Sequence, residues 1–152
     1  ETKVIHEKKQ NFLRIKLIEF SILYIMLNFN QIVSKEIEEL GDIEFTSEKN
    51  EELKNLIITS SADGRNFEKL LVDINLKYEN LIREINENSN IQIIIRDKSE
   101  EEILTILEDL KLDFKEQYNL KKIENLEKKL INNLDENSYS ELIKLKNQIN
   151  RE

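Results

Sequence analysis

The chain has 152 residues, 39% hydrophobic and 36% charged, with a net charge of −8 at pH 7. Cys and Pro are absent, and only two glycines and one histidine, His6, occur. This composition excludes disulfide scaffolds, thiolate or multi-histidine metal sites and glycine-rich phosphate loops. The acidic balance excludes broad coating of nucleic acid, which requires a clustered positive field.

The first predicted helix covers residues 12–27 and is apolar over most of its circumference. Two stripes recur at steps of three and four residues: Leu13, Leu17, Phe20, Tyr24 and Leu27, and Ile15, Ile18, Ile22, Ile25 and Phe29. Such a helix is typical of the centre of a bundle. A signal or membrane segment is the alternative, since basic residues precede the stretch. Glu19 interrupts it, however, and a span needs about 20 apolar residues, so no membrane role is expected.

Shorter elements follow. Residues 31–40 form a predicted second helix that ends at Gly41, a natural residue after a helix. Ser47 is expected to cap a third helix over residues 48–59. A fourth helix is predicted over residues 66–86, with a break near Asn75. Ile91–Ile95 is rich in branched residues and reads either as a buried extended link or as part of a helix.

A long helix and a final hairpin complete the chain. Ser99 and Glu102 form a predicted capping box, after which no helix breaker appears until about Leu134. Ser138 and Glu141 form a second predicted box that opens the last helix. We therefore predict an all-α fold: a helical bundle of residues 1–118, followed by a long helix and a protruding C-terminal antiparallel helical hairpin of residues 119–152.

The charges follow this division. Residues 36–52 carry eight acidic side chains and one basic, whereas residues 119–152 carry seven basic and six acidic. The hairpin is therefore the less acidic part. The hairpin contains one tyrosine, Tyr139, and a second, Tyr118, directly precedes it. Both have polar neighbours, and they are predicted either to anchor an interface or to pack at the hairpin.

No catalytic constellation is present. The acidic side chains fall on solvated helix faces and define no cleft with two carboxylates of separated pKa. A di-iron bundle would need Glu-x-x-His motifs, which do not occur. We expect no enzymatic activity and no metal or cofactor in this fragment.

The order of these features resembles the C-terminal helicase-binding domain of bacterial DNA primase, the DnaG type. Three stretches carry the likeness: 19–32, similar to its first core helix and the break after it; 41–53, similar to its passage into the third helix; and 124–149, similar to its closing hairpin. The run Leu142, Leu145 and Ile149 is similar to its usual ending. Asn30 stands where the family usually has proline, and the acidic body is a second departure.

The resemblance implies a non-catalytic domain that docks on the N-terminal domains of the hexameric replicative helicase and couples RNA primer synthesis to the replication fork. The candidate helicase-binding residues are Tyr118, Lys122, Lys129, Tyr139, Asn147, Gln148 and Arg151. Some members also bind the acidic tail of the single-stranded-DNA-binding protein. The loosely matching candidates here are Arg14, Lys16 and Arg83, for which solvated surface charge is the alternative.

The parent protein would be a cytoplasmic bacterial nucleotidyltransferase, a primase, whose zinc and magnesium belong to upstream domains outside this fragment. The first residue is Glu1, which is consistent with a fragment. The alternative function is a freestanding helical structural or effector protein of a host-dependent bacterium. An A+T-rich genome would explain the abundance of Ile, Asn and Lys beside a single alanine, Ala62. A zinc ribbon and polymerase core encoded directly upstream would distinguish the two.

Overall fold

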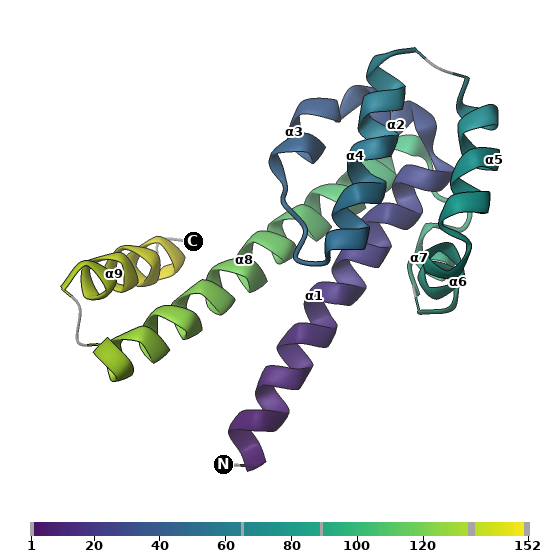
Figure 1. The fold of residues 1–152 in the computed structure, drawn as a ribbon. Helices are drawn as coiled ribbons and strands as arrows, with labels where there is room; N and C mark the ends of the chain where they lie inside the picture. The colour runs from purple at the N-terminus through teal and green to yellow at the C-terminus, as the bar shows by residue number, and fades with distance from the viewer. Residues whose placement is uncertain (1, 65, 89, 134–135, 151–152) are drawn as a thin grey trace. The chain divides into compact units, whose positions relative to one another are not determined.

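The computed structural model describes residues 2–64, 66–88, 90–133 and 136–150. Within these residues the chain forms nine helices and no strand, so the predicted all-α class is confirmed (Figure 1). The helices are α1 (Thr2–Asn28), α2 (Asn30–Lys35), α3 (Ile37–Asp42), α4 (Glu48–Ala62), α5 (Phe67–Lys77), α6 (Glu79–Asn88), α7 (Ile91–Ile95), α8 (Glu100–Asn133) and α9 (Glu136–Asn150).

The chain divides into two compact units. One unit is Lys16–Lys111, and the other combines Glu1–Ile15 with Leu112–Glu152. The division falls within α8, and the predicted boundary between residues 118 and 119 also falls within this continuous helix. The boundary at residue 118 stays a prediction.

The core of the Lys16–Lys111 unit is built around the C-terminal half of α1. Its buried apolar residues include those on about three turns of α1 and those that α2 to α4 add to them: Ile18, Phe20, Ile22, Leu23, Ile25, Met26, Leu27, Ile32, Val33, Leu40, Leu53 and Ile57. α4 packs on both α2 and α3, and α5 lies beside α4 and α6. Leu17, expected to face the core, is 45% exposed, so the burial of α1 is incomplete on that side.

Two predicted helices are each divided in the structure. The second breaks at Glu36, whose φ of −116° and ψ of 20° end α2 and begin α3. Gly41 lies inside α3 rather than after it, because the helix continues to Asp42. The fourth breaks at Tyr78, three residues after the predicted position, where the backbone takes a similar non-helical conformation. Ile91–Ile95 is the helix α7, not an extended link.

Helix starts follow local side-chain chemistry. The Asn50 N–H donates to Ser47 Oγ at 3.4 Å, which confirms the predicted cap of α4. The Glu102 N–H donates to Ser99 Oγ at 3.2 Å while the Ser99 N–H donates to Glu102 Oε1 at 3.3 Å, which confirms the capping box of α8. The second predicted box is wrong as a helix start, because α9 begins at Glu136 and Ser138 lies inside it.

Two charged side chains lie in the core of the Lys16–Lys111 unit. Glu19 is fully buried and accepts hydrogen bonds from the segment that enters α4. Lys54 is also fully buried; its ammonium group donates to the Ile43 carbonyl and lies 2.9 Å from Glu51 Oε1. Both groups are paired or hydrogen-bonded, as burial of a charge requires. Among the helices described, none combines the length and the apolar character needed to cross a bilayer.

Candidate docking site

The candidate site is the helical hairpin formed by the second half of α8 and by α9. Leu126 on α8 and Leu142 on α9 are 8% and 6% exposed, and they form the seam of the hairpin. An ion pair also joins the two arms, because Lys146 Nζ on α9 lies 3.2 Å from Glu127 Oε1 on α8. In Figure 1, α9 runs back along the end of α8, so the arms are antiparallel.

An open groove of about 480 Å³ lies between the two arms. One arm contributes residues spaced by three, four and seven positions, which place them on a single helix face: Lys122, Asn125, Leu126 and Lys129. The other arm contributes Glu141, Lys144 and Leu145 with the same spacing. Two leucines form the apolar part of the lining, and three lysines against one glutamate give it a net positive charge.

An aromatic stack occupies the root of the hairpin on α8. The rings of Phe114 and Tyr118 are stacked with centroids 6.1 Å apart and an angle of 16° between their planes. Lys122 Nζ lies 4.9 Å from the centroid of the Tyr118 ring, within cation–π distance. Phe114 is buried and Tyr118 half-buried. Tyr118 therefore packs within the hairpin and also offers part of its ring to solvent.

The other candidate helicase-binding residues are exposed where the structure describes them. Tyr139 is 56% exposed on the first half of α9, and Lys129 is exposed on α8. Asn147 and Gln148 are exposed near the end of α9. Arg151 lies outside the described residues. The structure brings Lys122 and Lys129 together in the groove.

The three candidates for binding an acidic peptide each have an acidic neighbour. Arg14 Nη2 lies 3.2 Å from Asp113 Oδ1 in one unit. In the other unit, Lys16 Nζ lies 3.9 Å from Glu84 Oε2, and Arg83 pairs with Glu79 at 3.5 Å.

Arg83 also lines an open groove of about 750 Å³ beside α5 and α6, which includes Glu79 and Glu87. The charges lining that groove sum to a negative value, which is unfavourable for an acidic ligand. The assignment of these three residues stays a prediction.

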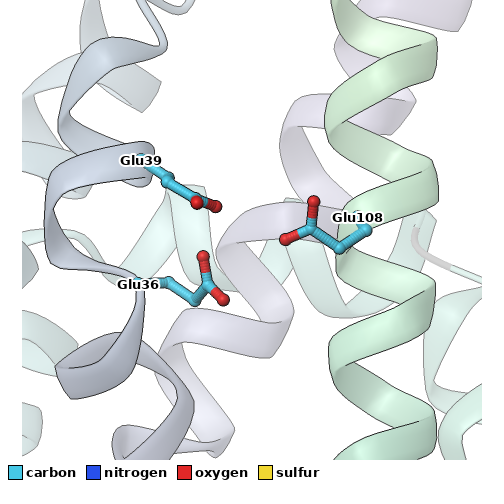
Figure 2. Close-up of side chains that lie close together, drawn as sticks. All are labelled: Glu36, Glu39 and Glu108. Atoms are coloured by element: carbon cyan, nitrogen blue, oxygen red, sulfur yellow. The ribbon is translucent and has the colours of Figure 1, made fainter.

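A carboxylate cluster lies elsewhere, in the Lys16–Lys111 unit. Figure 2 shows Glu36 and Glu39, at the junction of α2 and α3, facing Glu108 on α8, with carboxylate oxygens within 4.8 Å of one another. Lys111 lies among them: its Nζ is 3.1 Å from Glu36 and 2.6 Å from Glu108, and it also contacts Glu39. The ammonium group is thus the counter-ion of the cluster, and the arrangement is explained as an internal ion-pair network.

The network shifts the ionisation of its members. The hydrogen bond between Glu36 and Glu39, together with burial, raises the pKa of Glu36. The same hydrogen bond and a second one from Lys111 lower the pKa of Glu39. Burial acts to lower the pKa of Lys111, but its bonds to Glu108, Glu39 and Glu36 outweigh this effect and raise it above 10.5. The stabilisation by Lys111 is therefore fully present below pH 10.5 and is lost as the pH rises through its higher value in the folded protein.

No family model, curated protein or solved structure matches this chain.

Sequence reasoning did not select Asn125 or Lys144, which the structure places in the groove beside Lys122 and Lys129. The signal was present. Once an antiparallel hairpin is assumed, the face that carries Lys122 and Lys129 must also carry Asn125. The face of the second arm that carries Leu145 must carry Lys144 at its edge.

Proposed function

We propose that this chain is the helicase-binding domain of a bacterial replicative primase. In this role the hairpin of α8 and α9 docks on the N-terminal domains of the replicative helicase and brings primer synthesis to the replication fork. The domain itself catalyses nothing. The bacterial cytoplasm is its proposed location.

One observation carries the proposal. A bundle of short helices is followed by a single helix of 34 residues, which continues out of the Lys16–Lys111 unit and ends in an antiparallel hairpin with α9. This order is the one that the sequence resemblance implies for the family. The polar residues selected on that resemblance, Asn147 and Gln148, are exposed on α9 and available to a partner.

The burial pattern supports docking by the hairpin. Leu142 is needed to hold the arms together, because it is 6% exposed at the seam. Tyr139, three residues earlier, is 56% exposed and contributes little to that seam. Exposed tyrosines on a helical element are frequent anchors of protein interfaces.

The decisive test is binding of the purified chain to the N-terminal domains of the cognate helicase. Removal of residues 119–152 is expected to abolish binding and to leave the Lys16–Lys111 unit helical, since none of that unit's residues is removed. Binding would be measured by isothermal titration calorimetry and folding by circular dichroism. Undiminished binding by the truncated chain would refute the proposal.

A pair of point variants separates contact from folding. Tyr139→Ala is expected to weaken helicase binding by about thirtyfold, corresponding to about 2 kcal/mol for an interface anchor, with unchanged helicity. Leu142→Ala is expected to weaken binding because the hairpin loses its helical structure, which circular dichroism detects as a loss of helical signal. If Tyr139→Ala and a combined Asn147→Ala and Gln148→Ala variant both bind normally, the contact surface is assigned incorrectly.

A further inference from the structure

The groove between α8 and α9 contains positive charge that the described protein does not neutralise. Lys129 and Lys144 line it, and among the described residues neither has a carboxylate within ion-pair distance. Lys122 lies over the ring of Tyr118 and adds a third cation. Glu141 is the single acidic side chain of the lining. The groove is thus a local positive site on a chain whose net charge is −8.

Neighbouring lysines of the same hairpin differ in this respect. Lys128 lies 3.9 Å from Glu124 one turn earlier, and Lys146 lies 3.2 Å from Glu127 on the opposite arm. Neither lysine lines the groove. Lys128 and Lys146 are thus paired outside the groove, whereas Lys129 and Lys144 line the groove without an ion pair among the described residues, and the two sets can be tested against each other.

The apolar part of the groove is also incompletely covered. Two helices bury only the stripes that face each other, and here several seam residues remain half-exposed: Ile123, Leu130, Leu145 and Ile149. In the groove, Leu145 is half-exposed and lies beside the buried Leu126. A third helix with apolar residues on one face would cover this surface, as amphipathic helices do in apolar grooves.

We infer that this groove binds an acidic amphipathic helix of a partner protein, whose apolar face covers Leu145 and the edge of Leu126 while its carboxylates pair with Lys122, Lys129 and Lys144. The inference rests on the proposed function in taking the hairpin as the docking element, and it adds the chemistry of what docks. Charge complementarity selects the occupant: the cations repel a basic helix, and the two leucines favour a peptide over a purely ionic ligand.

The probe is a synthetic helical peptide about four turns long, with Leu at positions spaced by three and four residues and Glu at the others. Two matched peptides replace every Leu by Ser or every Glu by Lys. The ¹⁵N-labelled chain is titrated with each peptide and followed by NMR. The first peptide is expected to shift the amide resonances of Lys122, Leu126, Lys129, Lys144 and Leu145, more weakly at high salt, and the matched peptides to leave them unshifted.

The variants use the two kinds of lysine. Lys129→Glu combined with Lys144→Glu is expected to weaken peptide binding by at least about tenfold. Lys128→Glu combined with Lys146→Glu introduces the same charge change outside the groove and is expected to alter binding by less than about threefold. Equal losses in both pairs would show a non-specific charge effect and would overturn the inference.

Other occupants give other results, each of which overturns it. Shifts produced equally by the Leu-free peptide or by a single-stranded oligonucleotide would identify a polyanion site. Concentration-dependent self-association that displaces the peptide would identify a second copy of this chain. The helicase titration separates this inference from the proposed function. If the helicase binds the Lys129→Glu and Lys144→Glu variant normally but not the chain lacking the hairpin, only the groove is assigned incorrectly.

Discussion

Glu19 offers a sharp test of how the Lys16–Lys111 unit is held together. Its side chain has no exposed surface, and its carboxylate accepts four hydrogen bonds from the segment that leads into α4. The Thr46 N–H and hydroxyl donate at 2.7 and 2.8 Å, the Ser47 N–H at 3.4 Å and Asn50 Nδ2 at 2.9 Å. One side chain of α1 therefore fixes the start of α4.

Glu19→Ala removes the common acceptor of all four donors. A hydrogen bond to a charged group contributes about 1.5 kcal/mol or more, and a buried donor left unpaired costs about 1–3 kcal/mol. The Ser47 bond is long and Thr46 is exposed, so water can replace part of the loss. We therefore expect Glu19→Ala to lower the free energy of unfolding by about 3–5 kcal/mol, a large fraction of the 5–15 kcal/mol or so typical of a domain.

The assay is urea denaturation followed by far-UV circular dichroism. Glu19→Gln keeps one acceptor oxygen and the volume of the side chain, so an intermediate loss of about 1–3 kcal/mol is expected. Glu38→Ala, on the exposed face of α3, is the matched control and should change stability by less than about 0.5 kcal/mol. A loss below about 1 kcal/mol for Glu19→Ala would refute the reasoning.

Three further predictions concern the network, a helix start and the hairpin. Lys111→Met should lower stability by about 1–3 kcal/mol at pH 7. The loss should become smaller towards pH 4.5, because protonation relieves the repulsion between the remaining carboxylates; a loss independent of pH would contradict the network. Ser99→Ala should cost about 1 kcal/mol in denaturation experiments through loss of the α8 cap. Leu142→Ala should increase amide hydrogen exchange in α9 and leave that of α4 unchanged, since the two helices belong to different units.

The parts of the fold that could be predicted from the sequence are those with local causes. Ser99 and Glu102 are three residues apart, so their reciprocal bonds with each other's backbone depend on a single turn of chain. The apolar spacing of α1 likewise follows from a helical period that needs no knowledge of its partners. The capping box is therefore confirmed, and so is the apolar helix, although α1 begins at Thr2, ten residues before the predicted start, and its side that carries Leu17 is exposed.

The features that could not be predicted depend on distant residues. Glu19 was expected only to interrupt an apolar stretch, because its donors lie 27 to 31 positions later in the sequence. The ion pair between Lys111 and Glu36 joins residues 75 positions apart. The composition of the groove also depends on distant residues. Lys122 and Lys129 are predicted as single exposed charges, whereas Lys144 joins the groove only when the two arms are paired.

Ion pairing separates the two groove lysines Lys129 and Lys144 from the closely paired lysines of the Lys16–Lys111 unit. In the Lys16–Lys111 unit, Lys35, Lys54 and Lys111 each have a carboxylate within 3 Å, so their charge already stabilises the fold. A ligand that recruits such a cation must first break an existing pair, and that cost reduces its affinity. Among the described residues, Lys129 and Lys144 have no ion pair that a ligand would have to break. A surface whose charges are uncompensated in the free protein gains more from an oppositely charged partner, and among the described residues Lys129 and Lys144 provide such charges in the groove of the hairpin.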